Sequence, residues 1–352
     1  MNEQQAHPAN NEGEINIFSL SASKKLTDEV CKILNIEPKR IDTIRFADGE
    51  ILTQALDSVR GKDVYLIQST NSPVNDNLME LLIAIDALKR GSAQTINVVL
   101  PYYGYARQDR KAKGRQPITA KLVADLLTTA GADRVITIDI HSQQIMGFFN
   151  IPMDNFSAAQ TLAREIIDTI IDEHLDPKNC ILVSPDHGGL TRVHKVDSYT
   201  GSMTDGVAVI AKRRPEPNKA EVEFVLGDIK GKTCFIVDDM IDTGGTIING
   251  AKALKEAGAK EVYIFASHGV FSGQAPQKME QAIKEGIIKQ VVVTNTIDIP
   301  KDRQFKGLKV VSIAHMLADM IKASVNKHSL TQVYNDEQAE IFTHINRYLK
   351  KD

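Results

Sequence analysis

The residues best suited to chemistry lie in one segment, 233–248, which has the sequence TCFIVDDMIDTGGTII. A short apolar run at 234–237 predicts a strand that is buried on both faces. Asp238 and Asp239 follow this run directly, and an apolar helical pattern begins after Thr246. Ligands of an open α/β sheet bind beyond the carboxyl ends of its strands, so we expect both acids at a binding site.

The turn between these acids and the helix has the composition of a phosphate-binding loop. Gly244 and Gly245 let backbone N–H groups approach an anion, and the helix directs its free N–H groups and the positive end of its dipole at the same point. Thr243 and Thr246 add hydroxyl donors. The acids upstream would repel a phosphate and suit sugar hydroxyls or Mg²⁺ better. The alternative interpretation is a plain strand–turn–helix junction with aspartates as caps.

A basic segment is the second candidate. Residues 101–119 follow a predicted strand at 95–100 and precede a predicted helix at 119–130. Their only acid is Asp109, and their cations are Arg107, Arg110, Lys111, Lys113 and Arg115. A solvated loop, or one that binds RNA non-specifically, would have the same composition. The position at the carboxyl edge of the sheet favours a loop that faces a polyphosphate, whose charge Arg and Lys would neutralise.

Three other places carry possible site residues. His141 ends a predicted strand at 134–140, where a structural histidine is the alternative to a functional one. Asp186, followed by two glycines, comes after a predicted strand at 180–183. Residues 211–219 are basic and contain two prolines, so they predict a mobile loop, with an exposed loop of no role as the alternative.

These segments need a scaffold of alternating strands and helices. Apolar strand patterns at 15–20, 63–68, 95–100 and 134–140 are separated by helical patterns at 23–34, 78–90 and 119–130, and residues 44–50 predict a hairpin turn. The second half repeats this outline, with strands at 180–183, 206–210, 234–237, 261–266, 290–293 and 309–313 and helices at 158–172 and 313–323. The fold class is therefore α/β, with mostly parallel sheets flanked by helices. We expect a disordered tail at 1–13, domains at 14–157 and 158–328 with a crossing at 154–157, and a C-terminal extension at 329–352.

Composition excludes several classes of protein. The chain has 352 residues, a net charge of −3 and 25% charged residues, so any phosphate or nucleic-acid site must be local. Three cysteines, two of them in apolar strand patterns, favour a reducing compartment without a disulfide framework. The polar start is unlike a secretory signal, and no apolar run approaches the ~20 residues of a membrane helix. We expect a cytoplasmic protein that binds neither membrane nor nucleic acid.

Several motifs in order resemble one family, the phosphate-activated, magnesium-dependent ribose-phosphate diphosphokinases (5-phosphoribosyl 1-diphosphate synthetases). The 233–248 segment alone is similar to the 5-phosphoribosyl 1-diphosphate signature of type I phosphoribosyltransferases as well. The matching pieces are FADGE at 46–50, NDNLMELL at 75–82, YARQDRK at 105–111, DIH at 139–141 before GFF at 147–149, SPD at 184–186, KRR at 212–214 and VDDMIDTGGT at 237–246. The resemblance extends from about residue 15 to about residue 325.

The resemblance implies two similar phosphoribosyltransferase-type domains. It also implies a reaction, in which ATP and ribose 5-phosphate give 5-phosphoribosyl 1-diphosphate and AMP for nucleotide biosynthesis. The implied partners are these substrates, Mg²⁺, inorganic phosphate as an activator, and further copies of the chain in a homohexamer built from dimers.

The site roles implied by the resemblance follow the matched motifs. Ribose 5-phosphate would bind Asp238, Asp239, Asp242, Thr243, Gly244, Gly245 and Thr246. ATP would bind Arg107, Gln108 and Asp109, and its adenine would bind Phe46, Asp48 and Glu50 of a neighbouring subunit. Mg²⁺ would bind His141 and Asp186, although its preference for oxygen ligands makes His141 unexpected on chemistry alone. Lys212 and Arg214 would close over the transferring group. At the family's regulatory site one expected serine is missing, because residues 312–315 read SIAH.

Three other functions compete with this one. A phosphoribosyltransferase that consumes the product would share the 233–248 segment but would not need the ATP-type pieces or the additional domain. A non-catalytic regulatory relative would be expected to lose loop cations or metal ligands, and Lys212, Arg214, His141 and Asp186 are all present. An RNA-binding protein would be expected to have a net basic charge or stacking aromatics, and the chain has neither.

Overall fold

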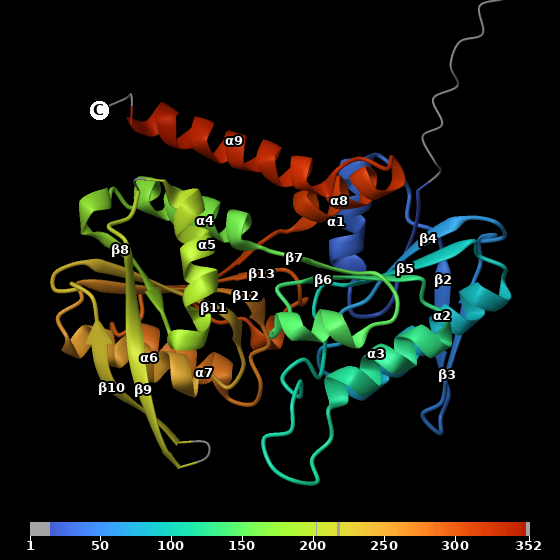
Figure 1. Cartoon of the computed structure of the whole chain (residues 1–352), viewed down its shortest axis with the longest axis horizontal. Helices are drawn as coiled ribbons and strands as arrows, with labels where there is room; N and C mark the ends of the chain where they lie inside the picture. Colours follow the sequence, from blue (N-terminus) through green and yellow to red (C-terminus); the bar gives the residue numbers. More distant parts are fainter. Residues whose placement is uncertain (1–14, 202, 217–218, 350–352) are drawn as a thin grey trace, which may run out of the picture.

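The computed structural model describes residues 15–201, 203–216 and 219–349, with side chains except those of 212–223. The tail expected at 1–13 lies outside the described residues. Within them the chain forms two α/β halves side by side (Figure 1). No helix in the described ranges is both long and apolar enough to span a membrane.

The N-terminal half is built on a parallel sheet. Its strand order is β1-β4-β5-β6-β7, and the strands are β1 (Asn16–Ser19), β4 (Asp63–Ile67), β5 (Thr95–Leu100), β6 (Arg134–Ile138) and β7 (Met153–Phe156). These strands are almost wholly buried because helices cover both faces. A separate antiparallel hairpin of β2 (Ile41–Arg45) and β3 (Ile51–Ala55) confirms the predicted turn at 44–50.

The C-terminal half contains a larger sheet with the order β10-β9-β8-β11-β12-β13-β14. Its parallel members are β8 (Cys180–Ser184), β9 (Val207–Glu216), β11 (Thr233–Ile241), β12 (Glu261–Gly269), β13 (Gln290–Thr294) and β14 (Leu308–Val311). The remaining strand, β10 (Lys219–Leu226), is an antiparallel edge next to β9.

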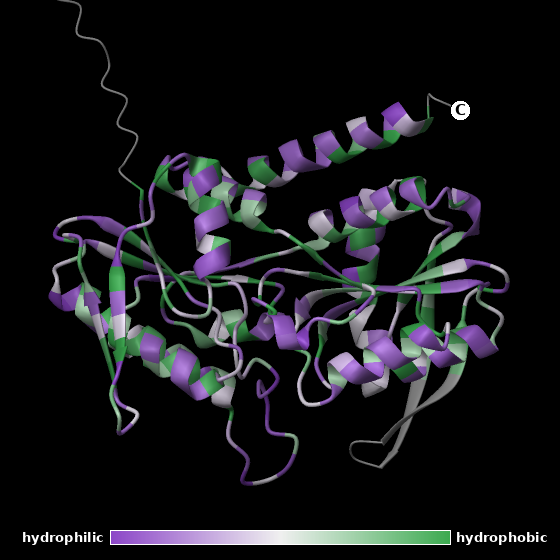
Figure 2. Cartoon of the chain, turned by 180° about the vertical axis from the view of Figure 1, so that it is seen from behind, coloured by the Kyte–Doolittle hydropathy of each residue, from purple (hydrophilic) through white to green (hydrophobic). Residues whose placement is uncertain are grey.

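The helices form a layer on each face of both sheets. One face of the N-terminal sheet packs against α2 (Val74–Arg90) and α3 (Thr119–Ala130), and one face of the C-terminal sheet packs against α6 (Gly245–Glu256) and α7 (Ala275–Lys284). The second C-terminal face packs against α4 (Ala159–Asp172), α5 (Leu190–Thr200) and α9 (Leu330–Leu349). Apolar residues gather in the sheets and on the inner sides of these helices (Figure 2).

One helix from the end of the chain belongs to the core of the first half. The second face of the N-terminal sheet packs against α1 (Lys24–Leu34) and against α8 (Ala314–Val325). Leu317, Met320 and Ile321 of α8 are almost fully buried in the same cluster as Ile17 and Tyr65. The apolar face of the first half is therefore completed by a segment that begins nearly 160 residues beyond its last strand.

The structure corrects the described part of the mobile loop predicted at 211–219, of which residues 217–218 lie outside the described residues. Residues 211–216 continue strand β9, which pairs with β10. Strand β8 pairs with β9 only as far as Val209, so the outer part of β9 has one neighbour. A proline such as Pro215 fits there because a ladder with one neighbour and a register shift tolerates a missing N–H.

Other boundaries also differ from the prediction. Strand β11 extends to Ile241 because its pairing with β12 continues beyond the end of β8, so Asp238 and Asp239 lie within the strand. Strand β6 ends at Ile138, two residues earlier than predicted, because Asp139 has a left-handed φ of +37°. The crossing predicted at 154–157 overlaps β7, and the chain changes sheets after it. Helix α2 ends at Arg90 as predicted, and the left-handed residue after it is Ser92, because Gly91 has a φ of −69°.

Candidate active site

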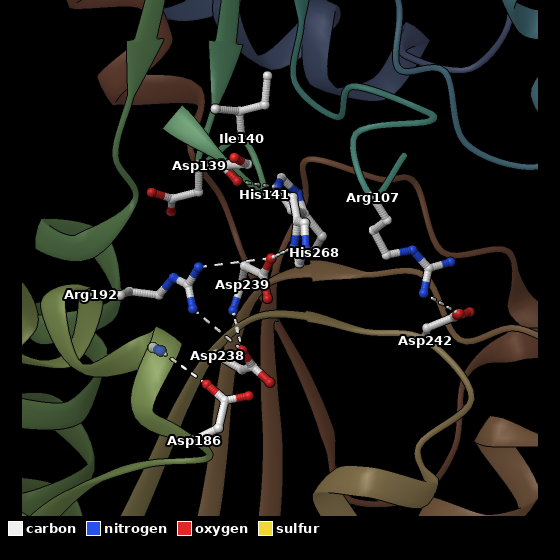
Figure 3. A network of polar contacts seen from close by, with 12 residues as sticks. Arg107, Asp139, Ile140, His141, Asp186, Arg192, Asp238, Asp239, Asp242 and His268 are labelled. Atoms are coloured by element: carbon white, nitrogen blue, oxygen red, sulfur yellow. Dashed lines mark hydrogen bonds and ion pairs between the residues drawn. The ribbon is translucent and has the colours of Figure 1, made fainter. Parts of the chain in front are cut away.

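Polar side chains from both halves meet beyond the carboxyl ends of the central strands. Figure 3 shows Arg107, Asp139 and His141 from the first half opposite a larger group from the second half, which consists of Asp186, Arg192, Asp238, Asp239, Asp242 and His268. Parallel strands end at the same edge of a sheet, which explains why residues far apart in sequence converge here. The site therefore exists only when the two halves are packed together.

The centre of the site is the acid pair on β11. Asp239 accepts a hydrogen bond from His141, with 2.6 Å between Oδ2 and Nδ1. Arg192 of α5 lies 3.3 Å from Asp238 Oδ1 and 3.8 Å from Asp239 Oδ2. The backbone N–H of Asp239 donates to Asp238 Oδ1 at 2.8 Å. The guanidinium of Arg192 thus contacts both carboxylates, and the imidazole of His141 contacts that of Asp239.

This environment separates the two acids electrostatically. Burial raises the pKa of Asp238 to about 8, and the charge of neighbouring Asp239 adds to the rise. Burial also acts to raise the pKa of Asp239, but the hydrogen bond from His141 and the charge of Arg192 together lower it below its usual range. The same hydrogen bond is the main cause of a raised pKa at His141. Of the two acids, Asp239 is therefore the one that ionises more readily, and Asp238 is the one that holds a proton more tightly.

The predicted phosphate turn has the geometry of an anion site. Gly244 precedes α6 with a φ of +77°, a conformation that glycine adopts without strain. No side chain caps α6 within the described residues, so its first N–H groups are available to a ligand. Asp242, at the start of the turn, pairs with Arg107 of the other half at 2.7 Å, Nη1 to Oδ2. An arginine and a helix N-terminus therefore lie next to each other at this edge.

Asp186 lies in the neighbouring acid–glycine turn. Its Oδ1 accepts a hydrogen bond from Gly189 N at 3.0 Å, and this cap begins the short helix His187–Gly189 that continues into α5. The turn therefore fixes the direction of α5 and with it the position of Arg192. In Figure 3, Asp186 and His141 lie on opposite sides of the contacts between Arg192 and the acid pair.

The donors fit a magnesium ion that is held mainly by substrate. Among the residues described, no three His, Cys, Asp or Glu side chains form a group that could bind a metal by themselves. Mg²⁺ commonly uses one or two protein ligands together with water and phosphate oxygens. Because Asp239 engages Nδ1 of His141, Nε2 is left for a ligand, as in metal sites where a carboxylate orients a histidine.

Other predicted site residues lie outside this cluster. Phe46, Asp48 and Glu50 occupy the exposed tip of the β2–β3 hairpin, at the outer edge of the first half (Figure 1). Gln108 and Asp109 lie on the loop that carries Arg107, where Gln108 Oε1 accepts a hydrogen bond from the Thr119 hydroxyl at 2.5 Å. The side chains of Lys212 and Arg214 are outside the described set, although their backbone lies in β9.

Three residues of the site were not predicted from the sequence. Arg192 is on α5, which the sequence did not predict as a helix. The helix has only two buried apolar residues, Val193 and Val196, so its sequence has no clear apolar periodicity. Ser267 and His268 lie on β12 beyond the predicted end of that strand, at Ala266. Ser267 donates to Asp139 Oδ2 at 2.5 Å, and fully buried His268 contacts the Asp139 carbonyl at 3.3 Å. In the sequence, only the position of Ser267 and His268 at the end of a strand could have indicated that they belong to the site.

Comparisons with known proteins agree with this geometry. Residues 15–131 match the model of the N-terminal domain of ribose phosphate pyrophosphokinase, and residues 217–335 match the phosphoribosyl synthetase-associated domain. Ribose-phosphate pyrophosphokinase 2 of Enterococcus faecalis is 48% identical over 308 residues, which are 88% of this chain and 92% of that protein. A ribose-phosphate pyrophosphokinase of Staphylococcus aureus is 47% identical over 321 residues, or 91% of this chain and 97% of the relative.

A solved structure agrees as well. The crystal structure of phosphoribosylpyrophosphate synthetase from Mycobacterium smegmatis superposes with a TM-score of 0.80 at 44% identity, covering 89% of this chain and 99% of that one. This likeness confirms the predicted fold class of two similar phosphoribosyltransferase-type domains, each a mostly parallel sheet flanked by helices. Sequence, fold and site geometry lead to one conclusion: the chain belongs to the ribose-phosphate pyrophosphokinase family.

Proposed function

We propose that this chain transfers the diphosphoryl group of ATP to the 1-hydroxyl of ribose 5-phosphate. The hydroxyl oxygen forms a bond to the β-phosphorus, the bond from that phosphorus to the oxygen bridging to the α-phosphate breaks, and the hydroxyl proton is released. The products are 5-phosphoribosyl 1-diphosphate, which serves nucleotide biosynthesis, and AMP. The supporting observation is that residues from both halves contact each other at one site. The second half contributes the acid pair and the uncapped N-terminus of α6, and the first half contributes Arg107 and His141.

Ribose 5-phosphate fits the β11–α6 turn. Its 5-phosphate would accept hydrogen bonds from the first N–H groups of α6 and from Thr243 and Thr246. Its ring hydroxyls would lie against Asp238 and Asp239, whose carboxyl oxygens can accept hydrogen bonds from them. This arrangement would hold the sugar by its 5-phosphate at one end and by its ring hydroxyls at the other.

ATP would bind from the side of the first half. Arg107 lies on the same loop as Gln108 and Asp109, at a place from which a triphosphate could reach the sugar. If the triphosphate displaced Asp242 from its ion pair, the guanidinium of Arg107 would be free to bind phosphate. His141 and Asp186 would each contribute to holding Mg²⁺, with water and phosphate oxygens completing the coordination. Bound Mg²⁺ would neutralise charge on the transferring group.

The remaining predicted roles concern the loop and the assembly. Lys212 and Arg214 would bring cations to the transition state from the β9–β10 ribbon. Phe46, Asp48 and Glu50 are too peripheral to complete the site of their own chain, so we propose that they bind adenine in a neighbouring subunit of a homohexamer built from dimers. We further propose that the chain acts in the cytoplasm and is activated by inorganic phosphate.

The test is AMP release from ATP and ribose 5-phosphate with Mg²⁺, with and without inorganic phosphate. We expect AMP only when the sugar phosphate is present, and 5-phosphoribosyl 1-diphosphate in equal amount. AMP formation that requires a nucleobase, or none under any condition, would contradict the proposal. In the second case a non-catalytic relative is tested next, by binding to an active homologue.

A loop variant tests the proposed catalytic cations. Lys212→Ala should lower kcat far more than it raises the KM of either substrate, because a cation that acts in the transition state contributes little to ground-state binding. Lys230→Ala, at an exposed lysine in the turn after β10, is the control and should leave both constants unchanged. An unchanged kcat in Lys212→Ala would remove this residue from the mechanism.

A further inference from the structure

The turn that presents His141 is held by the segment that leads from the first half to the second. Asp139 N donates to the Phe156 carbonyl at 2.7 Å, and Ile140 N donates to Asn155 Oδ1 at 3.0 Å. Ala158 N donates in return to Asp139 Oδ2 at 3.0 Å. Residues 155–158, here called the crossover, therefore shape the backbone immediately before His141.

This turn needs such support because its conformation is unfavourable. Asp139 has a φ of +37°, in the left-handed region that L-residues seldom adopt. A strained backbone persists only when several surrounding contacts fix it. The crossover supplies these contacts on one side, and Ser267 and His268 of β12 supply them on the other.

The outer side of the crossover is covered by α9. Ser157 N donates to the Tyr334 hydroxyl at 2.9 Å, and Ser157 is only 8% exposed. Gln160 Nε2 donates to the Tyr334 carbonyl at 2.7 Å, and the ring of Tyr334 lies edge-on to Phe156 with centroids 6.3 Å apart. Tyr334 therefore contacts the crossover through its hydroxyl, its ring and its backbone.

The rest of α9 packs against the second half and so fixes the position of Tyr334. Ile341 and Ile345 are buried against α4 and the C-terminal sheet, and His344 Nε2 lies 2.9 Å from Asp168 Oδ1. The helix runs from α8, which packs on the first half, across α4 and α5 of the second (Figure 1). The family model ends at residue 335, so most of α9 lies beyond it.

We propose that Tyr334 is a positioning residue: its hydroxyl, carried onto the crossover by the C-terminal helix α9, holds the turn that presents His141. Removing the hydroxyl leaves a buried Ser157 N–H without its acceptor, and such a donor shifts to find another partner. The shift is passed to Asp139 and Ile140 through the three hydrogen bonds of the crossover, and from them to His141.

The first arm of the test measures structure without substrates or metal. Hydrogen exchange is followed by mass spectrometry in full-length wild type, Tyr334→Phe and Tyr348→Phe. Tyr348 is the matched control, on the same helix and partly buried, with a hydroxyl that makes no hydrogen bond to a described residue. In Tyr334→Phe we expect about five-fold faster exchange at 155–158 and at 139–141, the effect of losing one buried hydrogen bond, and no change in Tyr348→Phe.

The second arm measures turnover and rests on the proposed function. Tyr334→Phe should lower kcat roughly three-fold with an unchanged KM for ATP, because His141 is displaced while the ATP loop is not. Melting temperatures are recorded so that assays run well below unfolding. A wild type that releases no AMP would contradict the proposed function, and the exchange arm would still decide the role of Tyr334.

Two results would overturn the inference. If exchange at 139–141 stays at the wild-type rate in Tyr334→Phe, the Tyr334 hydroxyl stabilises the crossover but does not position the turn before His141. Equal changes in Tyr334→Phe and Tyr348→Phe would show a general loosening of α9. A chain ending at Ser329, which lacks α9, should reproduce the faster exchange at 155–158 and at 139–141. If this shortened chain does not fold, the Tyr334→Phe result alone decides whether Tyr334 positions the turn.

Discussion

At the scale of single residues, Arg192 is the side chain that contacts both acids of β11. Two adjacent carboxylates that are both ionised in a buried site would repel each other strongly. Arg192 lies within 4 Å of both, and His141 joins Asp239 from the other half. The proposed sugar site thus includes an arginine outside the conspicuous Asp-Asp motif.

Arg192→Ala should weaken the use of ribose 5-phosphate. Losing a charged hydrogen-bond partner costs about 1.5–3 kcal/mol, so the KM for ribose 5-phosphate should rise roughly ten-fold or more while that for ATP changes little. Steady-state kinetics with each substrate varied in turn measures this. His194→Ala, at an exposed residue on the same helix, is the control. Equal increases in both KM values would argue against a specific role at the sugar site.

At the scale of elements, the β2–β3 hairpin is held by a buried carboxylate. Glu80 of α2 is fully buried and accepts hydrogen bonds from the hydroxyls of Thr43, at 2.8 Å, and Ser21, at 2.6 Å, and from Gln68 Nε2 at 3.1 Å. Arg45 of the hairpin lies 3.6 Å from its Oε2. This explains Glu80 in the motif at 75–82, which the sequence alone left without a role.

Glu80→Ala should destabilise the protein and loosen the hairpin. Breaking a buried charged network costs about 3 kcal/mol, which denaturant unfolding would detect. Thr53→Val in the same hairpin is the control, because the Thr53 hydroxyl is buried without a partner among the described residues and its loss should be neutral or stabilising. If Glu80→Ala unfolds at the wild-type denaturant concentration, the network contributes nothing to stability.

The docking of α9 should depend on pH. Burial raises the pKa of Glu337 to about 7, and the nearby charge of Asp319 on α8 raises it further than Arg164 on α4 can lower it. The folded chain thus binds this proton more tightly than the unfolded chain. The resulting stability is complete below the ordinary glutamate pKa and is lost as pH rises through about 7.

Glu337→Gln should remove this dependence. Between pH 5 and pH 8 the melting temperature of the wild type should fall more than that of the variant, by on the order of 2 °C. Asp336→Asn, at an exposed position on the same helix whose charge is not among the causes of the shift, is the control and should behave like the wild type. Parallel curves for wild type and Glu337→Gln would show that Glu337 has no raised pKa.

At the scale of the whole molecule, the two halves are not independent in their cores. Helix α8 comes from the end of the chain but covers the apolar face of the N-terminal sheet. We propose the boundary between domains at 157/158, with α8 as a segment that returns across it. The candidate active site is likewise made by both halves, through Arg107 with Asp242 and His141 with Asp239.

A fragment ending at residue 157 should therefore fail to fold alone. It would expose the face of Ile17, Val30 and Ile138 that α8 buries, so we expect aggregation or binding of a hydrophobic dye. Co-expression with residues 158–352 should restore a soluble complex. A soluble, monomeric fragment with a cooperative unfolding transition would show that α8 is dispensable for the first half.

The sequence by itself determined the elements and the chemistry that are local. Alternating apolar runs predicted the strands, and the acids and glycines after residue 237 predicted a sugar-phosphate turn, because a strand end, a turn and a helix start are set by neighbouring residues. Only the tertiary structure showed Arg192 between the acids, Glu80 under the hairpin and Tyr334 on the crossover. Each of these roles is a contact between segments dozens to nearly 180 residues apart, and local periodicity carries no information about which distant segments the packed sheets bring together.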